Sequence, residues 1–262
     1  MTAPVRVTAI IAARMASTRF PDKPLARIAG IPMIGHVYHR ARMAAGIDDV
    51  WIATCDESIM IYAASIGAPA VMTRDTHERA TDRIAEAVPA IEAQTGVRTD
   101  VAVLVPGDEP MLVPQMLTDL VAPMRRGDAA IANLMSGIDD TAEFEDPNAV
   151  KVVCDRAGHA LYFSREPIPS RQKFSGAIPK WKQLGLIAFT RDALLEYSAM
   201  TPTPLEQIES VDMNRVLEHG RHILMVETTV RTAAVDTPAD LTRVEGLMAA
   251  DPLIAQYAGR TA

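Results

Sequence analysis

The chain has 262 residues, of which 48% are hydrophobic, 23% charged and 5% aromatic, and its formal net charge is −7. These values are ordinary for a soluble globular protein, and the acidic balance argues against general binding of nucleic acid. No apolar run reaches the roughly 18 residues of a membrane span, and the N-terminus lacks the regions of a signal peptide. We therefore expect a cytoplasmic protein that contacts no membrane.

Apolar segments typical of buried strands alternate with amphipathic segments in the first half of the chain. The strands are predicted near 5–12, 49–54, 69–72 and 101–105, and the helices near 32–45, 57–66, 80–93 and 114–125. This alternation predicts β-α-β units and a mostly parallel sheet. Sheets of this kind bind ligands outside the carboxyl ends of their strands, where Arg14, Thr54 and Asp108 fall.

The pattern changes beyond about residue 130. Shorter strands are predicted near 150–154, 159–163 and 183–189, with a polar loop from Arg165 to Lys182. There follow a helix near 205–218, with Ile208, Val211, Val216 and Leu217 on its apolar positions, a strand at 222–227 and a helix from Pro238. We predict one α/β domain with a core of about 1–130 and 222–250 and a small inserted α+β subdomain of about 131–221.

The two cysteines, Cys55 and Cys154, lie in different elements without the C-x-x-C spacing of a zinc or redox site. We expect both to be free, buried thiols. A reducing compartment such as the cytoplasm fits this cysteine usage.

The loop after the first strand carries three cations among small residues. Arg14, Arg19 and Lys23 follow the strand, and the backbone around Ser17 is available to surround phosphate oxygens. Guanidinium groups pair with phosphate in a bidentate fashion, and a lysine adds a point charge. The pattern favours a polyphosphate ligand, although an ordinary solvated basic loop would have the same composition.

The fourth strand ends in the sequence Gly107-Asp108-Glu109-Pro110. Mg²⁺ prefers one or two carboxylates together with phosphate oxygens, and Asp108 directly follows the turn. Asp108 is therefore a candidate magnesium ligand, and a simple turn is the alternative. Near the other end of the chain, Asp236 precedes Thr237 and Pro238, where its side chain is placed to cap the helix that follows.

The basic loop, with the pattern R-x-x-S-T-R-x-P-x-K-P-L, resembles the opening loop of the CMP-Kdo synthetases, the 3-deoxy-manno-octulosonate cytidylyltransferases. Further stretches resemble this family in the same order along nearly the whole chain: 52–54, 72–74, 107–110, 146–153, 160–165, 204–206 and 235–238. The resemblance implies a Rossmann-like (GT-A-like) nucleotidyltransferase sheet flanked by helices, and a homodimer. It also implies a role in lipopolysaccharide biosynthesis.

The resemblance implies roles for individual residues. Asp236 joins Asp108 as a ligand of Mg²⁺, and the segment 73–83, which contains Arg74 and Thr81, surrounds the cytosine and ribose of CTP. In this segment the family's Ser-Gly-Thr is replaced by Arg79, Ala80 and Thr81. Cys55 replaces an aspartate of the family.

An acidic sugar acceptor would find suitable partners in the inserted subdomain. Arg165 can pair with a carboxylate, and Gln183, Glu206 and Glu209 can bond hydroxyl groups. Glu206 and Glu209 are three residues apart and share one helix face, for which a solvated surface is the alternative. Pro106 and Gln183 replace a glutamine and a histidine of the family, which predicts an altered acceptor pocket.

The expected reaction is attack by a hydroxyl of an anionic sugar on the α-phosphorus of CTP, with release of pyrophosphate. Asp108 and Asp236 would hold Mg²⁺, while Arg14, Arg19 and Lys23 would stabilise the leaving group. Two alternatives stay open: transfer of CMP to a different ulosonic acid, amino sugar acid or phosphonate, and a nucleotide-binding protein without catalytic activity.

Overall fold

The computed structural model describes residues 5–16 and 20–260, so the predicted ligands Ser17 and Arg19 lie outside the described residues. The chain divides into two compact units. The first contains residues 1–118 and 232–262, and the second contains residues 119–231.

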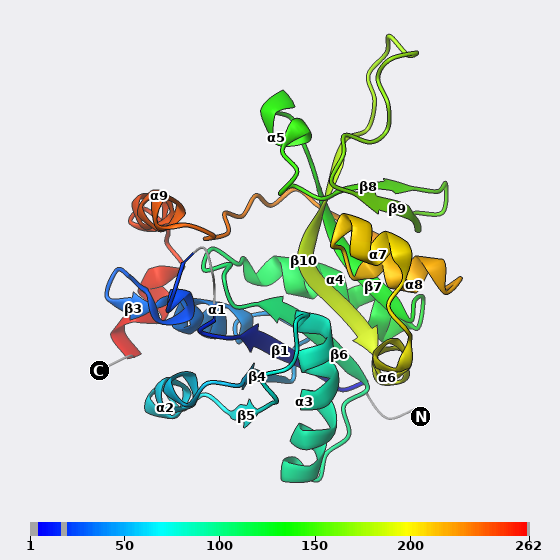
Figure 1. Ribbon diagram of the computed structural model, residues 1–262. Coiled ribbons are helices and arrows are strands. Elements are labelled where there is room, and N and C mark those ends of the chain that lie inside the picture. The colour runs from blue at the N-terminus through cyan, green and yellow to red at the C-terminus, as the bar shows by residue number, and fades with distance from the viewer. Residues whose placement is uncertain (1–4, 17–19, 261–262) are drawn as a thin grey trace. The chain divides into compact units, whose positions relative to one another are not determined.

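Four parallel strands form the sheet of the first unit (Figure 1). They are β1 (Val7–Ala13), β4 (Asp49–Thr54), β5 (Ala70–Met72) and β6 (Val101–Pro106), in the order β6-β1-β4-β5. This confirms the predicted parallel sheet. Since β1 has β4 on one side and β6 on the other, its carboxyl end lies at the point where the strand order reverses. Open α/β sheets bind their ligands at this point.

Helices α1 (Met33–Ala41), α2 (Glu57–Ser65) and α3 (Ala80–Thr95) connect these strands. Helices α1 and α3 contact β1, whereas α2 contacts β4 and β5. The predicted helices are confirmed with ends shifted by a few residues, and α4 (Pro114–Arg126) runs from the first unit into the second. Within the described part of the chain, no helix is long and apolar enough to cross a membrane.

A short hairpin that the sequence prediction lacks follows the basic loop. It consists of the 3-10 helix η1 (Lys23–Leu25) and the strands β2 (Arg27–Ile28) and β3 (Ile31–Pro32), which pair antiparallel. Ala29 and Gly30 form its turn, with φ of 48° and 84°. A two-residue turn of type I′ needs positive φ at both positions, which glycine adopts without strain.

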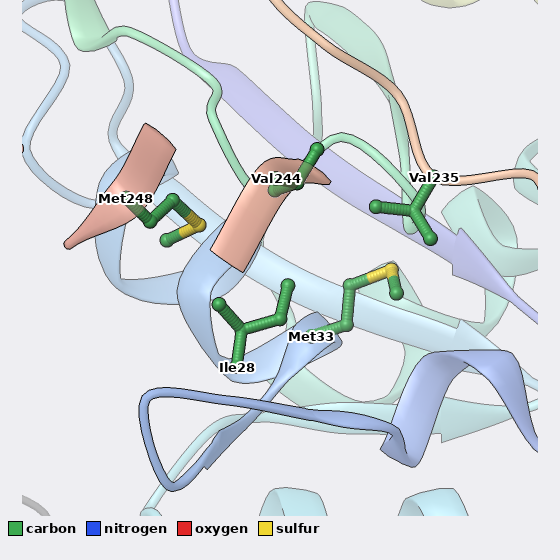
Figure 2. Packing of buried hydrophobic residues seen from close by; sticks show 5 residues of the cluster. All are labelled: Ile28, Met33, Val235, Val244 and Met248. Atoms are coloured by element: carbon green, nitrogen blue, oxygen red, sulfur yellow. The ribbon is translucent and has the colours of Figure 1, made fainter. Parts of the chain in front are cut away.

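The C-terminal segment packs back onto this hairpin. After α9 (Pro238–Met248) come the 3-10 helices η2 (Ile254–Gln256) and η3 (Ala258–Arg260). Figure 2 shows a buried cluster in which Ile28 and Met33 meet Val235, Val244 and Met248. Burial of a side chain of this size contributes about 1.5–3 kcal/mol. The cluster therefore fixes the residues on either side of Val235, including Asp236, in the first unit.

The second unit has a mixed sheet of shorter strands. They are β7 (Ile131–Gly137), β8 (Lys151–Cys154), β9 (Ala160–Ser164), β10 (Trp181–Thr190) and β11 (Leu224–Thr228). Strand β7 pairs antiparallel with β10 and parallel with β11, and β8 pairs antiparallel with β9 and β10. The helices of this unit are α5 (Thr141–Glu145), α6 (Arg191–Ala199), α7 (Pro204–Glu209) and α8 (Met213–Glu218).

Three sequence predictions differ from the structure. The helix expected over 205–218 is two helices, because Ser210 adopts a φ of 51° and ends α7. Ile208, expected on the apolar face, is 75% exposed. Cys55 and Cys154 are free thiols, as predicted, but both are only partly buried.

Candidate functional site

The basic loop begins at the carboxyl end of β1, and hydrogen bonds from two neighbouring segments position its first residues. The N–H of Met15 donates to Oδ2 of Asp56, which precedes α2, over 2.8 Å. Nη1 of Arg14 donates to the carbonyl of His77 over 3.3 Å. The guanidinium of Arg14 is thereby placed at the same edge of the sheet as the end of β6.

Lys23 lies between the two predicted magnesium ligands. Its Nζ is 2.7 Å from Oδ2 of Asp108 and 3.3 Å from Oδ1 of Asp236. Asp108 follows β6, and the Val235 N–H, next to Asp236, donates to the Asp108 carbonyl over 3.0 Å. Three segments distant in the sequence thus place one ammonium and two carboxylates together.

Gly107 permits this arrangement because β6 passes very close to β1. A Cβ atom at Gly107 would lie 3.0 Å from the carbonyl oxygen of Ala12 and 3.2 Å from Cβ of Ala13. Since the first neighbour is backbone, a side chain here would move one strand end against the other. The glycine therefore keeps Asp108 close to the loop that carries Arg14.

These residues surround a pocket of about 370 Å³ at the switch point of the sheet. Its lining includes four predicted site residues and a strongly basic wall. The lining residues are Ala12, Ala13, Arg14, Ala16, Lys23, Pro24, His77, Glu78, Arg79, Ala80, Arg83, Pro106, Gly107, Asp108 and Asp236. A pocket with this charge distribution suits a small polyanion that is bound together with a cation.

Glu86 of α3 fixes the loop that forms one wall of the pocket. Its carboxylate accepts hydrogen bonds from the backbone N–H of Arg74 (3.1 Å), from Nε of Arg74 (3.0 Å) and from Nε2 of His77. Burial raises the pKa of Glu86, but the hydrogen bonds from His77 and Arg74 together lower it by more, so the pKa lies below its usual value. The carboxylate form that makes these bonds is therefore favoured.

Arg83 lies behind the same wall and is 2% exposed. Its Nη1 donates to Oγ1 of Thr73 over 2.6 Å and to the carbonyl of Arg74 over 3.2 Å. Burial raises the pKa of the Cys55 thiol, and the positive charge of Arg83 opposes this shift. Cys55 stands where the family has an aspartate, so the buried guanidinium of Arg83 faces a neutral thiol at this position.

In the first unit, three predicted substrate-binding residues do not line the pocket. Thr54 is buried at the end of β4, where its Oγ1 accepts from the N–H of Asp56 over 3.1 Å. Thr81 is buried in the first turn of α3, and Arg74 points to Glu86. Direct contact of these three residues with substrate stays a prediction.

The predicted capping role of Asp236 is wrong. The helix α9 is capped by Thr237, whose Oγ1 accepts from the N–H of Asp240, and the Asp240 side chain bonds back to the N–H of Thr237. This capping box satisfies the first turn of the helix. The carboxylate of Asp236 is thereby left to contact Lys23.

The predicted acceptor ligands lie in the second unit, where most of their polar groups are already bonded. The guanidinium of Arg165 donates to the carbonyls of Glu209 (2.6 Å), Pro147 (2.8 Å) and Ser210 (3.2 Å). Gln183 donates from Nε2 to Oδ1 of Asn133 over 2.7 Å. Contact of these residues with an acceptor stays a prediction.

Glu206 and Glu209 have different surroundings although both belong to α7. Glu206 is 3% exposed and pairs with Nε and Nη2 of Arg215 over 2.7 and 2.6 Å. Glu209 accepts from the hydroxyls of Tyr162 (2.7 Å) and Ser164 (2.9 Å) on β9. A six-residue helix whose glutamates bind two different elements joins α8 to β9, so neither carboxylate forms a solvated surface.

The sequence prediction overlooked Asp56, His77 and Glu86, which hold the pocket wall in place. Glu86 falls in the middle of an amphipathic helix, where its spacing indicates only a polar face. His77 belongs to the segment that was expected to surround the base, and this position was the available signal. The metal site has few protein ligands. Within residues 5–16 and 20–260, no group of three or more His, Cys, Asp or Glu residues could hold a metal ion.

The chain is similar in sequence to known proteins. The model of the family described as "Cytidylyltransferase" matches residues 8–223. The chain belongs to this cytidylyltransferase family. The 3-deoxy-manno-octulosonate cytidylyltransferase of Geobacter metallireducens is 44% identical over an alignment of 252 residues that covers 92% of this chain and 96% of the relative. The enzyme of the same name from Solibacter usitatus is 42% identical, over 95% of this chain and 97% of the relative.

Two solved structures have a similar fold. A CMP:2-keto-3-deoxy-manno-octonic acid synthetase complexed with CTP has a TM-score of 0.85 and 38% identity, over 93% of this chain and 98% of that chain. The 4-diphosphocytidyl-2C-methyl-D-erythritol synthase of Anaerococcus prevotii has a TM-score of 0.64, with 10% identity over 94% of this chain and 100% of that chain. The second likeness concerns the fold alone.

Proposed function

We propose that this cytidylyltransferase transfers CMP from CTP to 3-deoxy-manno-octulosonate (Kdo), with release of pyrophosphate. The observation that carries the proposal is the placement of Arg14, Lys23, Asp108 and Asp236 around one pocket at the switch point of the sheet. A relative with 44% identity over 92% of this chain has this activity in its name, and a structural neighbour with a TM-score of 0.85 binds CTP. The product would serve lipopolysaccharide biosynthesis.

The residues of the pocket suit a reaction of two anions. Arg14, the predicted Arg19 and Lys23 would bind the phosphates and stabilise the charge that grows on the leaving pyrophosphate. The acceptor hydroxyl would give its proton to water as its oxygen bonds the α-phosphorus. The bond from the α-phosphorus to the bridging oxygen would break, and pyrophosphate would leave with the electron pair of that bond. The pocket wall fixed by Glu86 would hold the nucleotide in line for this displacement.

The carboxylates of Asp108 and Asp236 fit a magnesium ion. Both already contact the Lys23 ammonium, which is a stand-in for a cation at this place. Two carboxylates with phosphate oxygens form the ligand set that Mg²⁺ prefers in nucleotide sites. When bound there, Mg²⁺ would neutralise phosphate charge and lower the pKa of the acceptor hydroxyl.

The second unit would contribute the acceptor site and an interface between two copies of the chain. Arg165 and Gln183 are its candidate ligands, and Glu206 and Glu209 would act by fixing α7 against α8 and β9. The family resemblance implies a homodimer, and Leu161, Phe174 and Ile208 of this unit, which are 61%, 60% and 75% exposed, are candidate residues for its interface. Sedimentation of the protein and of Ile208→Asp tests this, because a monomeric wild type would contradict it.

We place the enzyme in the cytoplasm, where CTP is made and where its two free thiols stay reduced.

The function is tested by measuring pyrophosphate release with Mg²⁺, each of the four nucleoside triphosphates and a panel of acceptors. The acceptors are Kdo, other ulosonic acids, amino sugar acids and phosphonates. Release with CTP and Kdo is the expected result. Release with CTP and only a different acid would replace Kdo as the acceptor and make Pro106 and Gln183 candidates for the change. Binding of CTP without release for any acceptor would favour a non-catalytic nucleotide-binding protein.

A further inference from the structure

Lys23 directs its ammonium to the two residues that would hold the metal ion. Its side chain is 12% exposed, whereas those of Asp108 and Asp236 are 36% and 39% exposed. The two aspartates lie 85 and 213 residues away from Lys23 in the sequence. Such long separations mean that the tertiary fold, not local chain geometry, brings the ammonium to the carboxylates.

The same residue is suited to contact phosphate. Lys23 lines the pocket together with Arg14, Arg79 and Arg83. A lysine has a flexible four-carbon chain, so its ammonium can move between two neighbouring anions. With the pocket free of nucleotide, the carboxylates are the anions within its reach, and the ammonium neutralises part of their charge.

A divalent cation that enters this site without nucleotide therefore meets a competitor. It has two protein carboxylates to bind, and Lys23 already bonds an oxygen of each. Three arginines in the lining of the pocket add positive charge that repels it. A nucleoside triphosphate removes both obstacles to the cation. Its phosphate oxygens offer the ammonium another partner, and they complete the oxygen ligands of the cation.

We infer that Lys23 is an internal counter-ion that keeps divalent cations off Asp108 and Asp236 until a nucleoside triphosphate is present. Binding of the cation and of the nucleotide is then cooperative, because each is favoured by the displacement of the same ammonium. The inference rests on the proposed function, for which Asp108 and Asp236 are the metal ligands. It goes beyond that function in assigning an order to the binding events.

The first test measures Mn²⁺ binding to the full-length protein without nucleotide, by titration followed with electron paramagnetic resonance of free Mn²⁺. Lys23→Met removes the charge and keeps a side chain of similar length, whereas Lys23→Arg keeps the charge. We expect Lys23→Met to bind Mn²⁺ at least about fivefold more tightly than wild type, the equivalent of an exposed ion pair worth about 1 kcal/mol. Lys23→Arg should bind as weakly as wild type. Equal or weaker binding by folded Lys23→Met overturns the inference, and circular dichroism verifies that the variant is folded.

The second test repeats the Mn²⁺ titration with saturating CTP and no acceptor. In wild type, CTP should tighten Mn²⁺ binding more than it does in Lys23→Met, because the ammonium is no longer there to be displaced. Asp108→Asn separates this inference from the proposed function. If Asp108→Asn binds Mn²⁺ with CTP as well as wild type does, the metal assignment itself is wrong. If Asp108→Asn loses binding but Lys23→Met shows no gain, only the role of Lys23 is wrong.

Discussion

His36 of α1 and Tyr257 near the C-terminus are joined by a buried hydrogen bond of 2.8 Å between Nδ1 and the tyrosine hydroxyl. The Nε2 atom of His36 is 2.8 Å from the carbonyl of Ile28, so it carries the proton and Nδ1 accepts from Tyr257. The same hydroxyl accepts from Nε of Arg40 over 3.1 Å. The C-terminal segment that follows α9 is thereby bonded to the helix behind the basic loop.

The first prediction concerns the pH dependence of stability. Burial lowers the pKa of His36 from 6.5, and the charges of Arg40 and His39 lower it further, although the carbonyl of Ile28 raises it. Because the folded state favours neutral His36, its contribution is fully present above pH 6.5 and is lost as the pH falls below this value. The free energy of unfolding should fall with a slope of up to about 1.4 kcal/mol per pH unit from this residue.

Urea unfolding between pH 7.5 and pH 5 measures this slope. His36→Gln should flatten it, whereas His222→Gln, at an exposed position in the second unit, should leave it unchanged. A slope that is the same in His36→Gln and wild type would show that other groups cause the pH dependence.

The second prediction concerns the hydroxyl of Tyr257. Tyr257→Phe keeps the ring in place but leaves Nδ1 of His36 without its donor and Nε of Arg40 without its acceptor. An unsatisfied buried polar group costs about 1–3 kcal/mol, so we expect a loss of unfolding free energy in this range. Thermal unfolding measures it, and a melting temperature equal to that of wild type would mean that the bond is unimportant for stability.

The third prediction concerns the two carboxylates that contact Lys23. Asp108→Asn and Asp236→Asn should each lower Mg²⁺-dependent pyrophosphate release at least about 100-fold, since a metal-centred electrostatic contribution of several kcal/mol is removed. Because both side chains are more than a third exposed, the melting temperature should change little. Full activity in either folded variant would contradict the assignment as metal ligands.

The fourth prediction concerns Glu86, which contacts the loop and not the pocket. Glu86→Ala removes the acceptor of three hydrogen bonds from Arg74 and His77, so the carbonyl of His77 is no longer fixed for Arg14. We expect a higher KM for CTP with a smaller effect on KM for the acceptor. Because the pKa of Glu86 lies below its usual value, this support is present at neutral pH and is lost as the pH falls through that pKa.

A double-mutant cycle with Arg14→Ala examines whether Glu86 acts through Arg14. If it does, the double variant loses less CTP affinity than the sum of the two single losses. Additive losses would mean that Glu86 supports the fold independently of Arg14.

The fifth prediction concerns Gly107. Gly107→Ala places a Cβ atom 3.0 Å from the backbone carbonyl of Ala12 and should cost about 1–3 kcal/mol of stability, as overpacking does. Turnover should fall as well, because Asp108 moves with the strand end. Gly246→Ala is the matched control: it lies within α9 with no atom within 4 Å of the added Cβ, and should gain up to about 1 kcal/mol. Equal stability of the two variants would contradict the close approach of β6 to β1.

The parallel sheet of the first unit and the chemistry of its loops can be predicted from the amino-acid sequence alone. Buried parallel strands are continuous apolar runs, and their periodicity is local, so β1, β4, β5 and β6 are readable without any knowledge of contacts. Arg14 and Asp108 come just after the ends of β1 and β6, and Lys23 lies in the loop that follows β1. The resemblance of the motifs to a known family added Asp236, for which the local pattern indicates only a helix cap.

The pairing of charged groups, in contrast, depends on the folded arrangement of the chain. Lys23 meets Asp108 and Asp236, Glu206 meets Arg215, and Glu86 holds the wall of the pocket, in contacts that the spacing of these residues does not reveal. The break at Ser210 escaped prediction for a related reason: the apolar positions on both sides fit one helical period, while the left-handed residue between them is set by the packing of α7 and α8. Hydrophobic periodicity is a property of residues close together in the sequence, whereas charge pairing depends on distances that exist only in the folded chain.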